Sequence, residues 1–378
     1  MSGLRILALN WRSLEHPQAG GGEINLFEQA QRWARDGHQV TVLCGDSGRT
    51  LAPRQVSVEH GVIIRRMGGK FSVYACAALF LLRYGRQFDR ILDISNGVPF
   101  FSPLFTRTPS ALLIHHVHGE QWFSEFPAPV ARFGQLLESK VVPRLYRDRP
   151  VITVSPSTEE GLLRLGYRQQ QISVIYNGVQ LPPQTALRPP AAQRVLYLGR
   201  VKKYKRVDLL VRAVASLRGR FPQIFLDIAG DGDARPELED LVRELGLQEN
   251  VKIHGFVDDA QKEALLAVAT VFAQPSMHEG WGISVIEANA YGCPAVAYDV
   301  PGLRVAVQDG VTGILAQNDQ DFAEGIGRLL GDARLRARYS AAALEWARRF
   351  DWDASAQASL DVLKHAGATP GQRPGYGR

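Results

Sequence analysis

The stretch Val195–Leu210, VLYLGRVKKYKRVDLL, contains in sixteen residues the unit from which this chain is built. Its consecutive apolar residues VLYL are typical of a parallel strand that is buried on both faces. A glycine and a run of basic residues follow, and an amphipathic helical pattern then extends over Val207–Leu217. This order of strand, turn and helix predicts a parallel sheet covered by helices.

The same alternation of short apolar runs and helical stretches extends along most of the chain. Helical patterns lie between several runs, as at Glu23–Asp36 and Ala131–Tyr146, and crossovers of this kind build doubly wound sheets. The last stretch, Ala333–Leu363, is predicted to be helical with an interruption at Phe350–Trp352. The predicted strands are Arg5–Leu9, Val40–Leu43, Val62–Arg65, Arg90–Asp93, Ala111–Ile114, Val151–Val154 and Ser173–Ile175 in the first half, and Val195–Leu198, Ile224–Ala229, Val251–His254, Val271–Gln274, Ala295–Tyr298 and Gly313–Ala316 in the second.

A proline-rich segment divides the chain. Gln180–Gln193 carries four prolines and almost no apolar periodicity, which is typical of a linker. A chain of 378 residues fits two domains, each with its own core. We therefore expect an α/β fold of two Rossmann-like, doubly wound parallel-sheet domains. The expected parts are a first domain at 1–178, a linker at 179–193, a second domain at 194–348, a helix at 349–365 that crosses back to the first domain, and a disordered tail at 366–378.

Composition and charge narrow the class of protein. Apolar residues make up 45% and charged residues 22%, as in ordinary soluble enzymes, and the net charge of +6 is compatible with an anionic ligand, an acidic membrane or nucleic acid. Cys44, Cys76 and Cys293 are widely spaced and form no CxxC pair, so no disulfide framework or zinc site is predicted. The N-terminus does not have the form of a signal peptide, and we expect a cytoplasmic protein.

Two segments bear on membrane contact. The most apolar window, Val73–Leu82, has about half of the roughly 20 residues that a spanning helix needs, and a buried helix is predicted instead. Gln121–Arg149 mixes aromatic and basic residues, which makes it a candidate for peripheral contact with the inner membrane face. The alternative for this segment is a packing helix with an acceptor-site loop.

Ligands of such sheets bind beyond the carboxyl ends of the strands, so candidate site residues are sought in the segments that follow them. The first, Gly20-Gly21-Gly22-Glu23, opens a helix whose N–H groups suit a phosphate, although a flexible turn is the alternative because no GxGxxG or GK[ST] pattern is present. The second combines Gly199-Arg200 with Lys205 and Arg206, whose basic side chains can form ion pairs with a diphosphate. A solvated basic face is the alternative for this run.

The third segment, MHEGWGISVIEANAY at Met277–Tyr291, follows the predicted strand Val271–Gln274 and begins a helix near Gly282. Glu279 precedes this helix, and Glu287 lies one to two turns inside it. Carboxylates at these places can bind hydroxyl groups in two parts of one ligand, while the helix N-terminus holds its phosphates. The glycines and the tryptophan around Glu279 argue against an ordinary helix that happens to carry two glutamates.

The fourth segment is His115-His116-Val117-His118, after the predicted strand Ala111–Ile114. Three imidazoles at a strand end suit proton transfer, the binding of hydroxyl groups or a metal. Zinc is disfavoured, because adjacent residues leaving a strand point in different directions. We expect one of these histidines to be functional and the others to be structural.

Together, these segments resemble the retaining glycosyltransferases of family 4, whose two-domain GT-B architecture has the domains facing a cleft. The most specific element is a pair of glutamates with seven residues between them, which Glu279 and Glu287 match in EGWGISVIE. Support comes from HPQAGGGE, GHQVTVL, VSPSTEEGL, VIYNGV, LGRVKKYKRVDLL, AGDGD and IHGFV, which occur in the order that such enzymes show. The resemblance covers nearly the whole chain, up to about Leu363.

The resemblance implies catalytic and donor-binding roles at the matched positions. Glu279 would hold hydroxyls of the donor sugar and Glu287 those of the ribose, while Arg200 and Lys205 would neutralise the diphosphate. Either His115 or His116 would face the sugar, and the tandem histidines leave the choice open. The other residues of the donor site, most of which would contribute backbone groups, are Gly20, Gly21, Gly230, Phe256, Gly280, Trp281, Gly282, Ile283 and Ser284.

The implied reaction moves a sugar from a nucleotide diphosphate to a hydroxyl acceptor. No nucleophile for a covalent intermediate is evident. The resemblance implies that the acceptor attacks the face that the diphosphate leaves and that the diphosphate takes its proton. Such enzymes need no metal or cofactor. Asp231-Gly232-Asp233 and Asp351-Trp352-Asp353 look like a metal-binding DxD, but the first lies in a predicted βα turn and the second at a late helix junction, so both are predicted to be structural. The base, the sugar and the acceptor stay open.

Other classes of protein remain as alternatives. A nucleotide-sugar epimerase shares this architecture, whereas a phosphorylase would need a bound pyridoxal phosphate and a longer chain. A non-enzymatic protein could bind nucleic acid or a membrane through RVKKYKR, but Val207–Leu217 continues this run as an amphipathic helix without further basic and aromatic interleaving. A dinucleotide-dependent oxidoreductase would need GxGxxG after the first strand. The expected partners are a nucleotide sugar and an acceptor, with no nucleic acid.

Overall fold

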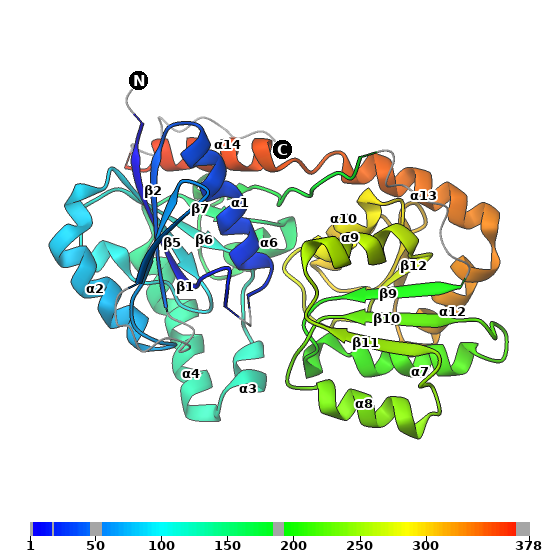
Figure 1. Cartoon of the computed structure of the whole chain (residues 1–378). Helices are drawn as coiled ribbons and strands as arrows, with labels where there is room; N and C mark the ends of the chain where they lie inside the picture. The colour runs from blue at the N-terminus through cyan, green and yellow to red at the C-terminus, as the bar shows by residue number, and fades with distance from the viewer. Residues whose placement is uncertain (1–2, 17–18, 46–54, 184–192, 368–378) are drawn as a thin grey trace. The chain divides into compact units, whose positions relative to one another are not determined.

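The computed structural model describes residues 3–16, 19–45, 55–183 and 193–367, which form two compact units (Figure 1). The first unit comprises residues 1–178 and 352–378, and the second comprises residues 179–351. The helix that follows Asp351 therefore belongs to the first unit. Residues 184–192 of the expected linker and residues 368–378 of the expected tail lie outside the described residues.

The first unit is built on one mostly parallel sheet. Among its described residues the sheet has eight strands in the order β3-β4-β2-β1-β5-β6-β7-β8, with β3 antiparallel to β4. The seven predicted strands are all present, because their consecutive apolar side chains fill both faces of the sheet. The bounds are β1 Arg5–Arg12, β2 Gln39–Gly45, β3 Gln55–Glu59, β4 Val62–Arg66, β5 Arg90–Ser95, β6 Ser110–Ile114, β7 Val151–Thr153 and β8 Ile172–Val174.

Strand β3 is the one that the apolar pattern does not predict. It forms a hairpin with β4 through His60 and Gly61, whose φ angles of 47° and 80° suit a two-residue turn of the primed type. Val56 and Val58 are exposed at this edge of the sheet. A strand with one exposed face alternates in polarity, so it lacks the continuous apolar run by which the buried strands are found.

Two layers of helices cover the faces of this sheet. Leu7 of β1 packs with the helix α2, whereas the next residue, Ala8, packs with α1 and α14 on the opposite face. Trp33 of α1 donates a hydrogen bond to the carbonyl oxygen of Ala356 in α14 at 2.8 Å, so α14 is tied into this core. The bounds are α1 Gly21–Arg35, α2 Ser72–Tyr84, α3 Gln121–Glu125, α4 Ala128–Leu136, a π-helical turn Leu137–Val141, α5 Val142–Leu145, α6 Pro156–Arg164 and α14 Trp352–Lys364.

Helix α2 contains the most apolar window of the chain, and the prediction that it is a buried helix is only half right. Val73, Ala77, Phe80 and Leu81 are buried against the sheet. The outward side chains of Phe71, Leu79 and Leu82 are instead 65–69% exposed. Within the part of the chain that the structure describes, no helix is long and apolar enough to cross a membrane.

The second unit is a parallel sheet of six strands among the described residues, in the order β11-β10-β9-β12-β13-β14. All its predicted strands are present, and one face of the sheet packs on the helices Val207–Leu217, Arg235–Glu244 and Asp319–Gly331. The strand bounds are β9 Arg194–Leu198, β10 Phe225–Ala229, β11 Val251–Gly255, β12 Val271–Gln274, β13 Ala295–Tyr298 and β14 Gly313–Ala316. The helix bounds are α7 Val207–Leu217, α8 Arg235–Glu244, α9 Asp259–Val268, α10 Ile283–Ala290, α11 Leu303–Ala306, α12 Asp319–Gly331 and α13 Ala333–Ala347.

Candidate active site

The second unit brings two of the candidate segments together at one edge of its sheet. Strands β9 and β12 are parallel neighbours, so the loops after Leu198 and Gln274 leave the sheet side by side. The order of the strands reverses between these two, since β10 and β11 follow β9 on one side and β13 and β14 follow β12 on the other. Open α/β sheets bind their ligands at such a reversal, beyond the carboxyl ends of the strands.

The carboxylate of Glu279 is the centre of a buried polar cluster at this edge. Lys205 Nζ lies 2.5 Å from Glu279 Oε1, and Gln274 Nε2 donates to the same oxygen at 2.6 Å. Burial alone would raise the pKa of Glu279, but the charge of Lys205 and the hydrogen bonds from Lys205, Gln274 and Ser276 together hold this pKa below its usual range. Glu279 is therefore ionised at neutral pH.

This cluster joins residues that the sequence assigns to separate tasks. Lys205, predicted to act on a diphosphate, and Glu279, predicted to act on hydroxyl groups, are direct partners here. Gln274, the last residue of β12, holds Glu279 in place and was not among the predicted residues. Its position at the end of a strand, five residues before Glu279, is the only sequence signal for it.

Tyr204 connects the loop after β9 with the loop after β12. Its hydroxyl accepts a hydrogen bond from Arg200 Nη2 at 2.9 Å, and its carbonyl oxygen accepts one from the backbone N–H of Met277 at 3.0 Å. Tyr197 of β9 donates its hydroxyl proton to the carbonyl oxygen of Arg200 at 2.9 Å. The loop that carries Arg200 and Lys205 is thus fixed from both sides.

The N-terminus of α10 lies directly after this cluster. Gly282 caps the helix with a φ of 87°, and a Cβ at this position would lie 2.9 Å from Leu303 Cδ2, so only glycine fits without strain. The backbone N–H of Val285 donates a hydrogen bond to the carbonyl oxygen of Gly282. The N–H groups of Ile283 and Ser284 precede it in the first turn of the helix and have no acceptor one turn back. Helix N-termini of this kind bind phosphate groups.

Glu287 has a basic partner that the sequence does not reveal. Lys262 of α9 lies 3.1 Å from Glu287 Oε1 and 3.2 Å from Asp259 Oδ1. Burial alone would lower the pKa of Lys262, but the charges of Glu287 and Asp259 raise it above its usual range. Because α9 and α10 are separated by β12, no local pattern in the sequence brings these residues together.

The other predicted residues of this unit are placed as follows. The Trp281 side chain is 2% exposed and packs edge-on against Phe350 with ring centroids 5.0 Å apart, so only its backbone can face a ligand. Phe256, after β11, is 82% exposed. Gly230 has a φ of 142°, and a Cβ there would lie 1.9 Å from the carbonyl oxygen of Gly199, which explains the glycine. Gly280 lies between Glu279 and Trp281 in the loop that leads to α10.

In the first unit, the glycine turn after β1 leads into helix α1. One of the N–H groups predicted to bind phosphate there is already hydrogen-bonded within the protein. The backbone N–H of Gly20 donates to Glu23 Oε2 at 2.8 Å. The N–H groups without an acceptor one turn back therefore begin at Gly21 rather than at Gly20. The sequence could have suggested this, since a glutamate three residues after the cap is a known capping partner.

His115 lies against this helix N-terminus. Its Nε2 is 3.4 Å from Asn25 Oδ1, and a Cβ on Gly22 would lie 3.4 Å from its Cε1. Burial lowers the pKa of His115 to about 4, so the imidazole is neutral at physiological pH. Among the described residues its Nδ1 is buried without a hydrogen-bond partner. The ring is thus a neutral group beside the first turn of α1.

His116 and His118 form a separate group. Their rings stack with centroids 4.2 Å apart, and the His118 ring also packs on Trp122. Glu138, in the π-helical turn, accepts hydrogen bonds from the backbone N–H of His118 at 2.7 Å and of Gly119 at 3.0 Å, and from Trp122 Nε1 at 3.1 Å. Burial alone would raise the pKa of Glu138, but His118 and these N–H groups hold it lower. Glu138, which was not predicted, shapes the histidine loop.

The two DxD runs are occupied by other contacts. Asp231 Oδ1 accepts from the N–H of Gly232 at 2.8 Å, and Asp233 pairs with Lys202 at 3.1 Å. Asp353 pairs with Arg32 at 2.6 Å and with Arg35 at 3.1 Å. Within the described residues, no group of three or more histidine, cysteine or acidic residues is arranged to hold a metal ion.

The comparison with known proteins identifies the family. The model of the glycosyl transferases group 1 matches residues 184–346, and that of glycosyltransferase family 4 matches residues 19–181. D-inositol 3-phosphate glycosyltransferases from Streptomyces bingchenggensis and Streptomyces scabiei are 32% and 38% identical over 96% of this chain, covering 89% and 90% of theirs. The chain belongs to glycosyltransferase family 4, and it is a glycosyltransferase.

Solved structures agree with this fold. The Anabaena protein Alr3699/HepE, in complex with UDP and glucose, has a TM-score of 0.77 at 21% identity and covers 96% of this chain and 99% of its own. Sucrose-phosphate synthase from Thermosynechococcus elongatus has a TM-score of 0.78 at 21% identity, with 96% and 98% covered. At this level of identity the likeness shows the fold, which is the predicted GT-B arrangement of two parallel-sheet domains.

Proposed function

We propose that this glycosyltransferase moves a sugar from a nucleotide diphosphate to a hydroxyl acceptor, with retention at the anomeric carbon and without a metal. The observation that carries the proposal is the arrangement around α10. An ionised Glu279 paired with Lys205 precedes the helix, two N–H groups open it, and Glu287 lies within it. Two carboxylates that can bind hydroxyl groups thus flank a helix N-terminus that can bind phosphate. This arrangement matches the sugar, the diphosphate and the ribose of a nucleotide sugar.

Each part of the donor has a proposed partner. Glu279 and the backbone of Gly280–Gly282 hold the sugar, and Glu287 holds the ribose. Lys205, Arg200 and the N–H groups of Ile283 and Ser284 hold the diphosphate, because positive groups stabilise it as it leaves. The backbone near Phe256 and near Gly230 is proposed to lie beside the base. The uridine nucleotides are the first to test, since they are bound in the HepE structures.

The proposed retaining course is supported by the roles that these groups can play. Glu279 is already paired with Lys205 and hydrogen-bonded by Gln274, so it suits hydroxyl binding better than attack on carbon. The acceptor oxygen forms its bond to the anomeric carbon on the face where the bond to the diphosphate breaks, and its proton passes to the diphosphate. The enzyme supplies position and positive charge. From the first unit, we expect the N–H groups from Gly21 onward to add to this charge.

A neutral imidazole is proposed to face the sugar. His115 fits this role because burial keeps it uncharged and because it lies beside the glycine turn of α1. His116, which stacks on His118, is the other candidate. Each of the three histidines is substituted by alanine, and the rate of sugar transfer is measured. The substitution of the histidine that faces the sugar should lower kcat the most.

Metal independence is supported by the cations already at the site. Lys205 and Arg200 can neutralise a diphosphate as Mg²⁺ does in other enzymes. From the two DxD runs, Asp233 and Asp353 are paired with lysine and arginine, and Asp231 accepts a hydrogen bond from a backbone N–H. We therefore propose that no cofactor other than the donor itself is needed.

The acceptor is proposed to be a hydroxyl compound, either a small molecule, a lipid or a glycan. D-inositol 3-phosphate is the first to test, because the relatives from Streptomyces are named for it. We also propose a cytoplasmic enzyme with peripheral contact to the inner membrane face through Gln121–Arg149. Phe133 and Leu136 in this segment are exposed, which supports such contact.

Donor binding tests the proposal. UDP-, GDP-, ADP- and dTDP-sugars are added to the wild type and to Glu287→Ala with EDTA present, and the melting temperature is measured. A rise for the wild type that is weakened in the variant supports the site and identifies the base. No rise with any nucleotide sugar, or an equal rise in the variant, would overturn it. Release of an epimerised nucleotide sugar would favour the epimerase alternative.

A further inference from the structure

Helix α2 presents an apolar face to solvent that the fold leaves uncovered. Phe71, Ala75, Leu79 and Leu82 are spaced so that they lie along one side of the helix, and all four are exposed. The opposite side is buried against the sheet, so α2 is apolar all round. A helix of this kind is normally covered on both sides.

The charged residues of the α2 segment itself have one sign. From residue 70 to residue 88 the sequence carries Lys70, Arg83 and Arg86 and no aspartate or glutamate. Lys70 and Arg83 lie at the two ends of the apolar stripe, and Arg86 follows one turn further on. The face is therefore an apolar strip with a basic border, which is the pattern of helices that lie in the interface of a membrane.

Helix α4 and the turn that follows it continue the same layer of the first unit. Asp93 of β5 lies on the α2 side of the sheet, two residues after Ile91, and there it is hydrogen-bonded by Tyr146 at the end of α5. Figure 1 shows α2 beside the strands, on the side away from α1, and α4 below the strands. Helices α2 and α5 thus pack on the same face of the sheet, and α4 leads into α5 through the π-helical turn.

The outer side of α4 has the same character as that of α2. Val130, Phe133 and Leu136 are 50–61% exposed. The exposed charged residues nearby are the basic Arg132, Lys140, Arg144 and Arg147 and the acidic Asp148, which pairs with Arg168. Glu138, the acidic residue of the π-helical turn, points inward to the N–H groups of His118 and Gly119. Its charge is therefore directed away from this surface.

We propose that this surface, the α2–α4 face, docks on the surface of an anionic lipid bilayer. It consists of the apolar residues Phe71, Leu79, Leu82, Val130, Phe133 and Leu136 and the basic residues Lys70, Arg83, Arg86, Arg132, Lys140 and Arg144. The apolar side chains enter the boundary between headgroups and acyl chains, and the basic ones contact lipid phosphates. At 13 residues α2 is about 20 Å long, so it lies on the bilayer rather than crossing it.

A second copy of the chain fits this face less well than a membrane. In a two-fold symmetric dimer the same residues meet from both sides, so Lys70, Arg83 and Arg86 would face other basic or apolar groups with no acidic partner from α2. Like charges that meet across an interface oppose association. An anionic bilayer supplies both the apolar and the negative counterpart.

The proposal deepens the membrane contact put forward above by placing α2 in it, and its test needs no glycosyl transfer. Vesicles of phosphatidylcholine with about a third phosphatidylglycerol, and vesicles of phosphatidylcholine alone, are sedimented with the protein. The first variant is Leu79→Gln with Leu82→Gln, and its control is Leu163→Gln with Val311→Gln, which are exposed apolar residues elsewhere. The second is Arg83→Gln with Arg86→Gln, and its control is Arg334→Gln with Arg338→Gln on α13.

The wild type should sediment with the anionic vesicles and much less with phosphatidylcholine alone, and added salt should weaken binding. The leucine variant should bind about tenfold more weakly and the arginine variant about 20- to 30-fold more weakly, while both controls bind as the wild type does. Because all the changed side chains are exposed, the melting temperature should not change.

Absence of vesicle binding by the wild type, or unchanged binding by both α2 variants, would overturn the proposal. A dimer by light scattering that only the α2 variants dissociate would assign the face to a second copy instead.

Donor binding by the vesicle-binding variants separates this proposal from the proposed function. The α2 variants should keep the donor-induced rise in melting temperature, because none of their residues belongs to the donor site. If the wild type binds vesicles but no donor raises its melting temperature, the membrane proposal stands and the proposed reaction is contradicted. If a donor raises the melting temperature but the wild type does not bind vesicles, the proposed reaction stands and the membrane proposal is contradicted.

Discussion

The ammonium group of Lys205 lies 2.5 Å from the Oε1 atom of Glu279, and the two side chains are only 11% and 15% exposed. Lys205 follows β9 and Glu279 follows β12, so the pair joins two loops that lie 74 residues apart in the sequence. A buried pair of this kind is stable only while both charges are present. It therefore links the fold of the second unit to the groups that are proposed to bind the donor.

Removing one partner of this pair should destabilise the protein more than removing both. Lys205→Met leaves the buried carboxylate of Glu279 without a cation, and the free energy of unfolding should fall by about 3 kcal/mol. Adding Glu279→Gln should restore most of it, because the unpaired charge is gone. Urea unfolding measures both. Lys203→Met, which removes an exposed pair with Glu237, is the control and should change the free energy by less than about 1 kcal/mol. Additive effects of the two substitutions would contradict the coupling.

The buried His115 should make stability depend on pH. Its pKa is about 4 in the folded protein against an ordinary value of 6.5, so the unfolded chain binds more protons between these two values. The contribution of His115 is therefore fully present above pH 6.5 and is lost as the pH falls toward 4, by up to about 3 kcal/mol. His115→Gln should flatten this part of the stability profile, whereas His278→Gln, at an exposed site, should not. A profile that is equally steep in His115→Gln would show that other groups cause the slope.

Gly282 should be needed for both stability and donor binding. In Gly282→Ala the new Cβ meets Leu303 and the φ of 87° is strained, so the free energy of unfolding should fall by about 2 kcal/mol. The shifted N-terminus of α10 should weaken the binding of the donor that the screen identifies, as measured by calorimetric titration. Gly246→Ala is the matched control, because its φ is 64° but the space around it is open, and its donor affinity should not change. Equal donor affinity in both variants would separate α10 from the donor site.

Lys262 should act on donor binding through Glu287. Lys262→Met removes the partner 3.1 Å from Glu287 Oε1, so the carboxylate loses its fixed orientation and the KM for the donor should rise about tenfold. The kcat at saturating donor should stay near the wild-type value, because the reacting atoms are not touched. Steady-state kinetics separates the two constants, with the exposed Lys252→Met as the control. A fall in kcat at constant KM would assign Lys262 a different role.

The sequence is sufficient to predict most of the fold. Runs such as Val195–Leu198 are apolar on consecutive residues, and this pattern is typical of strands in a sheet whose two faces are both covered by helices. The edge hairpin of β3 and β4 escapes prediction because Val56 and Val58 face solvent. The sequence also does not predict that one side of α2 is exposed. Because α2 is apolar on every side, its sequence does not tell which side the sheet covers.

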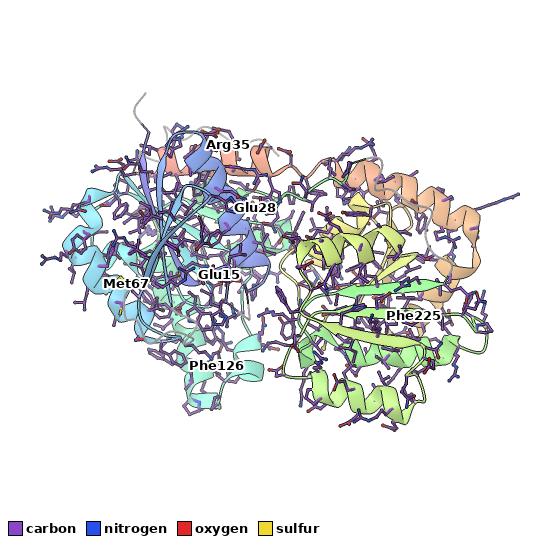
Figure 2. The ribbon with its side chains drawn as sticks, viewed as in Figure 1. Glu15, Glu28, Arg35, Met67, Phe126 and Phe225 are labelled. Carbon is purple, nitrogen blue, oxygen red and sulfur yellow. The ribbon has the colours of Figure 1, made fainter. Side chains whose placement is uncertain are left out.

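The site can be predicted where a motif carries it and not where tertiary packing does. The spacing of Glu279 and Glu287 is enough to place one carboxylate just ahead of α10 and the other within it. Their partners Gln274 and Lys262 come from β12 and α9, and only the folded chain brings them near. The labelled Glu15, Glu28 and Arg35 in Figure 2 lie on the first unit, and no motif assigns these charged residues to the site.

The most direct test of the account is the configuration of the sugar that the enzyme releases. The donor that raises the melting temperature is incubated with the protein in EDTA, with water or D-inositol 3-phosphate as acceptor, and the anomeric signals of the first product are followed by proton NMR. The account predicts a product with the configuration of the donor, formed without divalent metal, and a large loss of activity in Lys205→Ala and Glu287→Ala. An inverted product, or turnover only after a divalent metal is added, would contradict it.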